Sequence, residues 1–100
     1  MKLEEKAEKK EYEVTILDRT AYTVSPRIGV RVVQVDVAYV VEDRPPRVVT
    51  ISMPEVKPEE LDEFQKQLSE EKGRLWDIYK EKEKKAIRED IEKYVPPTIR

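Results

Sequence analysis

The fold is decided by residues 28–42, IGVRVVQVDVAYVVE, which hold the longest run of β-branched residues in the chain. Such side chains favour extended strands. From position 33 onward the odd positions are apolar and most even ones are not: apolar residues are Val33, Val35, Val37, Tyr39 and Val41, against polar Gln34, Asp36 and Glu42. A period of two is typical of a strand with one buried face. This stretch is the predicted central strand of a small sheet.

The alternation changes phase near the start of this stretch. There the apolar residues are Ile28, Val30 and Val32, and the polar one is Arg31. A straight strand would turn this apolar set away from the face that buries Val33 and its successors. One extra residue in the strand restores the register. The sequence therefore predicts a β-bulge near Val32 and Val33.

Two further strands flank the central one. The first begins at Tyr12 and continues to about Val24, and residues 25–27, Ser-Pro-Arg, form a turn that folds it back. Two consecutive prolines at 45 and 46 cannot donate to a ladder, so they mark a second turn. The third strand covers residues 47–53. Residues 12–53 are therefore predicted to form an antiparallel sheet.

The period changes after Pro54, and residues 58–94 read as helix. Pro58 suits the first helical position, and Glu59 and Glu60 suit the positive end of the helix dipole. Gly73 interrupts the pattern, but the residues after it offer no N-cap, so one helix with at most a bend is expected. The predicted fold is one α+β domain: a three-stranded antiparallel β-meander followed by one long C-terminal α-helix packed on one face.

The two ends carry little that a core could bury. Residues 1–11 alternate Lys and Glu and are expected to form a mobile charged arm or a short helix, or an arm that orders on a partner. Residues 95–100 are expected to be a tail. The start lacks the apolar core of a signal peptide, and no apolar run approaches the roughly 20 residues that span a bilayer. A cytoplasmic protein that does not contact membranes is expected.

Composition argues against an enzyme. Cysteine, histidine and asparagine are absent, and charged residues make up 42% of the chain, a bias that fits a hyperthermophilic source. Without histidine the chain lacks the commonest general base and metal ligand. A hairpin centred at Arg27 would place Asp18 opposite Asp36, where two carboxylates could hold a cation. A solvated pair is favoured, and neither a metal nor a cofactor is predicted.

The apolar residues of the helix form two stripes. The first, from Leu61 to Tyr79, suits the valine face of the sheet, whereas the second is rotated by about a third of a turn. The charged run at 80–85 separates them, so the helix is expected to leave its sheet near Tyr79. Either the chain's own arm or sheet edge covers the second stripe, or another copy does. The expected oligomer interface consists of Trp76, Ile87, Ile91, Tyr94 and Val95.

Arginines accompany tyrosines in the strand region and suggest a second function. Guanidinium groups pair with phosphate and exposed rings stack on bases, as single-stranded nucleic acid requires. The candidate contacts are Arg19, Arg27, Arg31, Arg44, Arg47 and Tyr22. Acidic residues in the same region nearly cancel this charge. The favoured expectation is therefore a small non-enzymatic interaction or assembly protein acting through homo-oligomerisation, most simply as a dimer, and through protein–protein contacts; single-stranded nucleic-acid binding is the alternative.

Overall fold

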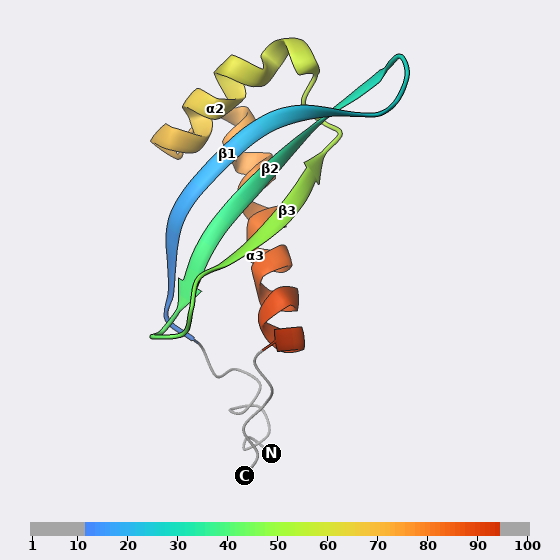
Figure 1. The fold of residues 1–100 in the computed structure, drawn as a ribbon. Helices are drawn as coiled ribbons and strands as arrows, with labels where there is room; N and C mark the ends of the chain where they lie inside the picture. Colours follow the sequence, from blue (N-terminus) through green and yellow to red (C-terminus); the bar gives the residue numbers. More distant parts are fainter. Residues whose placement is uncertain (1–11, 95–100) are drawn as a thin grey trace, which may run out of the picture.

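A computed structural model describes residues 12–94 as an antiparallel sheet with helices on one face (Figure 1). The strands are β1 (Val14–Arg27), β2 (Val30–Val41) and β3 (Arg47–Met53), in the order β1-β2-β3. A 3-10 turn η1 (Pro58–Glu60), a short helix α2 (Leu61–Glu70) and a long helix α3 (Arg74–Tyr94) follow. The predicted α+β class with an antiparallel meander and a long C-terminal helix is confirmed. The arm predicted at 1–11 and the tail at 95–100 lie outside the described residues.

The core lies between the odd-numbered residues of β2 and the two α-helices. Val33, Val35, Val37 and Tyr39 have no exposed surface, so the alternation that the sequence predicts is confirmed. Helix residues that fill the other side of the core are Phe64, Leu68, Leu75 and Tyr79. Burial of each such side chain contributes about 1.5 to 3 kcal/mol. The central strand therefore supplies most of the sheet's contribution to stability.

The predicted bulge in the central strand is wrong. Val32 and Val33 pair with the consecutive residues Val24 and Thr23, and the register shifts lie instead in β1, between Ile16 and Asp18 and between Val24 and Arg27. The apolar residues Val30 and Val32 keep their phase and face the side of the sheet opposite the helices.

The shifted register also separates the two aspartates that the sequence placed opposite each other. Asp18 pairs with Ala38, and Asp36 pairs with Thr20. The predicted juxtaposition of Asp18 and Asp36 is therefore wrong, because Arg27 pairs with Val30 and the hairpin turns at Ile28 and Gly29 rather than at Arg27.

The single helix predicted over residues 58–94 is broken at Gly73. Glu71 adopts a left-handed conformation with φ 57°, and Gly73 has φ 119°. A Cβ atom at Gly73 would lie 2.3 Å from Oε1 of Gln67. That same oxygen accepts hydrogen bonds from the backbone N–H groups of Leu75 and Trp76, at 2.8 and 3.2 Å. The cap of α3 thus comes from a side chain in α2, and only glycine leaves room for it.

The break redirects α3 along the sheet, so the expectation that the helix leaves the sheet near Tyr79 is wrong. Ile87 and Ile91 are each only 7% exposed and pack with Tyr39 and Val41 of β2. Figure 1 shows the first part of α3 behind β2 and β3 and its last turns beside β3. A helix of 21 residues is about 31 Å long, which the roughly 40 Å of β2 can accommodate. Both apolar stripes therefore belong to one core.

Candidate interaction surface

Arg19 ties the edge strand β1 to α3. Its Nε and Nη2 atoms donate to the two carboxylate oxygens of Glu83 at 2.6 and 3.0 Å, and its Nη1 donates to Glu71 at 2.9 Å. The Tyr79 hydroxyl also donates to Glu83, at 2.8 Å, and the guanidinium lies 4.8 Å from the ring centroid of Trp76. The hydrogen bonds to Glu83 raise the pKa of Arg19. We call this set of contacts the Arg19 clamp.

Arg47 ties the other edge strand, β3, to the same helix. Its Nε and Nη2 atoms donate to Asp90 at 2.8 and 3.0 Å, and the Tyr39 hydroxyl donates to the same carboxylate. The guanidinium lies 3.4 Å from the ring centroid of Tyr94. The hydrogen bond from Arg47 lowers the pKa of Asp90, and burial raises the pKa of Tyr39. We call this set the Arg47 clamp.

The clamps and the core occupy most of the residues that the sequence marked for partners. Trp76 and Tyr94 stack on the clamp arginines, and Ile87 and Ile91 are buried inside the protomer. Val95 lies outside the described residues. Arg19 and Arg47 have their guanidinium groups engaged by carboxylates. Sequence reasoning missed Glu83 and Asp90; their spacing of seven residues, two helical turns on one face, is the signal that could have indicated both clamps.

The other predicted nucleic-acid contacts lie apart from one another. Arg27 and Arg31 flank the turn between β1 and β2, whereas Arg44 lies in the turn between β2 and β3 at the opposite end of the sheet. Arg31 donates to the Thr23 hydroxyl at 3.3 Å. Tyr22 lies on the edge strand β1 beside Gln34, with its hydroxyl bound to Asp36. The structure therefore does not bring these residues together.

One face of the sheet has no helix on it among the described elements (Figure 1). We call it the open face; it carries the even-numbered residues of β2 and their neighbours in β1 and β3. Apolar residues occupy its two ends. The hairpin patch, at the tip of the β1–β2 hairpin, consists of Val24, Ile28, Val30 and Val32. The turn patch, near the β2–β3 turn, consists of Ala38, Val40 and Val48.

The exposure of the two patches is unusual for large apolar side chains. Ile28 is 99% exposed and Val48 is 58% exposed. The hairpin tip extends past β3, whose pairing with β2 begins only at Val33. Val30 and Val32 therefore have a strand neighbour on one side only. The other members of the two patches are half-buried. Apolar side chains grouped in this way are typical of interaction sites.

The centre of the open face is polar and internally hydrogen-bonded. Asp36 accepts hydrogen bonds from the hydroxyls of Tyr22 and Thr50, at 2.8 and 2.7 Å. The hydrogen bond to Asp36 raises the pKa of Tyr22. Tyr22 also lies 3.3 Å from the amide oxygen of Gln34. Several polar groups of the strip between the patches are thus hydrogen-bonded to one another.

The ends of the open face carry opposite charge. Arg27, which pairs with Val30, lies at the hairpin end, and residues 19–35 include no acidic residue. Arg31 has the opposite parity and donates to Thr23 on the other face. Glu13, Glu42 and Asp43 lie at the other end, with Arg44 as the only base of the β2–β3 turn. Glu42 is held close to Glu13 by a backbone hydrogen bond of 2.9 Å. The open face therefore has a basic end and an acidic end.

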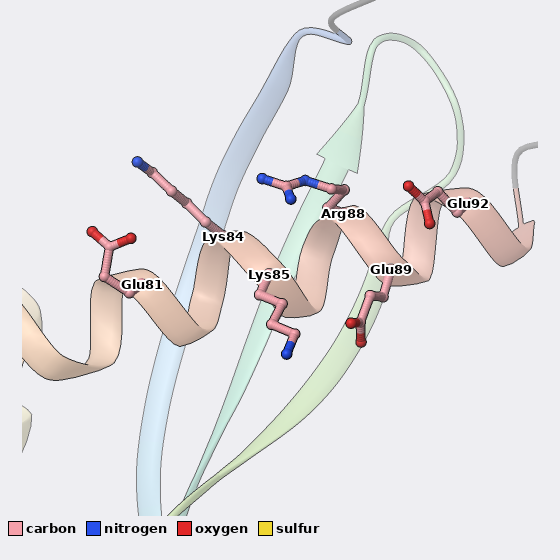
Figure 2. Close-up of a pocket in the computed structure, with 6 residues that line it drawn as sticks. All are labelled: Glu81, Lys84, Lys85, Arg88, Glu89 and Glu92. Atoms are coloured by element: carbon pink, nitrogen blue, oxygen red, sulfur yellow. The ribbon is translucent and has the colours of Figure 1, made fainter. Parts of the chain in front are cut away.

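A shallow recess on the outward side of α3 offers no chemistry of its own. Figure 2 shows its lining of six charged side chains: Glu81, Lys84, Lys85, Arg88, Glu89 and Glu92. Opposite charges recur at a spacing of four residues, as on a solvated helix. Across residues 12–94 no group of three or more candidate metal ligands occurs. No helix in that range is long and apolar enough to cross a membrane.

Comparison of the chain with protein-family models, with curated proteins and with solved structures gives no match.

Proposed function

We propose that this is a small non-enzymatic assembly protein that acts through protein–protein contacts, with the open face of its sheet as the working surface. The observation that carries the proposal is the apolar character of the hairpin patch and the turn patch. Ile28 and Val48 gain nothing from exposure to water, whereas burying each against a protein is worth about 1.5 to 3 kcal/mol. Homo-oligomerisation, most simply as a dimer, is the mode of action proposed here.

The polar centre of the open face is compatible with this role. Interfaces of non-obligate complexes combine apolar areas with hydrogen-bonded polar ones. Tyr22, Asp36 and Thr50 already bond to one another, so covering them leaves few donors or acceptors without a partner. The catalytic alternatives lack support, because histidine and cysteine are absent from the sequence.

The proposed setting is the cytoplasm of a hyperthermophile. The composition supports it, with 42% charged residues and neither asparagine nor cysteine. The Arg19 and Arg47 clamps add ion pairs that are hydrogen-bonded to tyrosine and stacked on aromatic rings. Ion-pair networks of this kind become more favourable as temperature rises.

Single-stranded nucleic-acid binding is the second candidate, and Arg27 with Arg31 on an acid-free hairpin is the observation in its favour. The positions of the other candidate residues support nucleic-acid binding less well than protein–protein contacts. Arg19 and Arg47 are bound to carboxylates, and the Tyr22 hydroxyl is bound to Asp36 in the middle of the sheet. Asp36 would also face the phosphates of any strand lying across the sheet.

Light scattering of the full chain over a wide concentration range tests the proposal. We expect a dimer that Val40→Lys converts to a monomer with an unchanged CD spectrum. Glu89→Gln on the outward side of α3 changes the net charge equally and is the matched control; it should leave the dimer intact. A wild-type protein that is monomeric at high concentration contradicts the proposal. Binding of a fluorescent single-stranded oligonucleotide that weakens steeply between about 50 and 200 mM salt would favour the second candidate.

A further inference from the structure

We infer that the partner is a second copy stacked on the open face with its strands antiparallel, so that Val32 in the hairpin patch of each copy faces Val40 in the turn patch of the other. This inference rests on the proposed function and specifies its geometry. The two-fold axis lies between the sheets and crosses the strands near Asp36. Such an interface is isologous, because each copy contributes the same surface.

The positions of the apolar residues along β2 fit this axis. Val32 and Val40 lie four residues to either side of Asp36, and both point to the open face. A two-fold axis at Asp36 therefore places Val32 of each copy opposite Val40 of the other. This arrangement also explains the change of phase in the apolar pattern of β2. Val30 and Val32 at one end and Val40 at the other are apolar because they lie on the open face.

Charge selects this axis over the alternative one. Two sheets can also stack about an axis parallel to the strands, which would place hairpin tip on hairpin tip. That arrangement opposes Arg27 to Arg27 and Asp43 to Asp43. The antiparallel arrangement instead brings the basic hairpin end of each copy to the acidic turn end of the other, since Arg27 pairs with Val30, six residues before Asp36, and Glu42 lies six residues after it. Charges at the rim of an interface fix orientation in this way.

The surface is of adequate size for a dimer. The twelve residues of β2 extend about 40 Å, and three strands are about 14 Å wide, giving a flat footprint of roughly 550 Å² per copy. Side-chain relief makes the accessible area larger than the flat footprint. A standard interface buries about 800 Å² per partner. Aligned packing of two sheets, with the strands about 30° apart, then forms a sandwich.

The arrangement has one unfavourable contact, which makes it testable. The two Asp36 carboxylates approach each other across the axis, although each accepts hydrogen bonds from Tyr22 and Thr50. Removing the charge with Asp36→Asn should therefore tighten the dimer severalfold at low salt, and the gain should shrink as salt rises. Asp62→Asn, at an exposed position of α2 on the other side of the sheet, is the matched control and should change the dimer little.

Cysteine cross-linking tests the orientation directly, because the native chain contains no cysteine. In the Val32→Cys/Val40→Cys double variant the two thiols of one copy are about 26 Å apart, so a short bismaleimide can join them only between copies. We expect covalent dimers from the double variant and none from either single variant. Efficient dimers from Val32→Cys alone would show hairpin on hairpin and overturn the inference while leaving the proposed function standing.

A charge exchange gives an independent readout. Arg27→Glu should weaken the dimer most at low salt, and adding Asp43→Arg should restore it. CD melting of each variant confirms that the fold is retained. If Arg27→Glu has no effect and Val40→Lys still yields monomers, the orientation is wrong and the open face is still the interface. If neither variant changes a dimer that does form, both the inference and the proposed function fail.

Discussion

Arg19 of β1 and Glu83 of α3 are joined by two hydrogen bonds, of 2.6 and 3.0 Å, although 64 residues separate them in the sequence. Both side chains are almost buried, at 13% and 10% exposure. Removing Glu83 leaves the poorly solvated Arg19 with only its bond to Glu71, and it leaves the Tyr79 hydroxyl without its acceptor. Breaking a buried pair in this way costs about 3 to 5 kcal/mol, and the remaining bond to Glu71 favours the lower value. Glu83→Ala should therefore lower the free energy of unfolding by about 3 kcal/mol, as measured by urea denaturation.

The control for this prediction is an exposed ion pair of the same chain. Arg74 and Glu60 approach to 3.7 Å, and the Arg74 side chain is 70% exposed. Arg74→Ala should change stability by less than about 0.5 kcal/mol. The double variant Arg19→Met/Glu83→Leu should recover most of the loss caused by Glu83→Ala, because it removes both charges together. Equal losses from Glu83→Ala and Arg74→Ala would show that the clamp contributes no more than a surface pair.

The Arg47 clamp predicts a pH dependence of stability. The pKa of Asp90 is lowered in the folded state, chiefly by its hydrogen bond from Arg47. The stabilisation is therefore fully present above the unfolded pKa of about 3.9 and is lost as pH falls through the lower, folded value. Asp90→Asn should be less stable than wild type at neutral pH, and the difference should shrink steadily below about pH 4. Thermal melts from neutral to strongly acidic pH measure it. A difference that stays constant over that whole range would contradict this assignment.

Of the two glycines, Gly73 is predicted to be the more sensitive to substitution. Gly73→Ala would place a methyl group 2.3 Å from Oε1 of Gln67 in a backbone conformation with φ 119°. We expect a loss of about 1 to 3 kcal/mol, together with disruption of the cap that Gln67 provides to α3. Gly29→Asn is the control, because Gly29 has φ 81° but a Cβ atom there would meet no other atom within 4 Å, and asparagine tolerates this region. Similar melting temperatures for the two variants would rule out a special role for Gly73.

The sheet could be predicted from the sequence because its signal is local. Residues 33–41 place an apolar side chain at every odd position, and the prolines at 45 and 46 mark the turn without reference to any other part of the chain. The course of the helix could not be read in this way. The cap of α3 is the Gln67 side chain, eight residues before Leu75, and no rule based on adjacent residues identifies it.

The open face could not be predicted from the sequence for a similar reason. The phase of Val30 and Val32 predicts a bulge only if every apolar side chain of the strand is assumed to face the core. In the structure they lie on the open face beside Val24, and the register shifts occur in β1. Arg19 and Arg47 showed their charge in the sequence, but their carboxylate partners in α3 became apparent only once the helix was placed.

The last prediction concerns Ile87 and Ile91, which the sequence assigned to an oligomer interface. Each is 7% exposed and packs on Tyr39 and Val41 within the same chain. Lysine at either position must bury a charge or displace α3 from the sheet, and losing a buried isoleucine alone costs about 2 to 5 kcal/mol. Together the two losses approach the roughly 5 to 15 kcal/mol that stabilises an ordinary domain. Ile87→Lys with Ile91→Lys should therefore abolish cooperative melting and most of the helical CD signal.

The contrast with the open face makes this result decisive. Val40→Lys adds the same kind of charge to a side chain that faces away from the helices, so it should keep the CD spectrum and change only the oligomeric state. Light scattering and CD on both variants separate the two surfaces. A double isoleucine variant that stays folded and becomes monomeric would return the interface to α3. The expected result is an unfolded double isoleucine variant and a folded, monomeric Val40→Lys variant. That result would show that α3 stabilises the sheet and that the open face forms the interface.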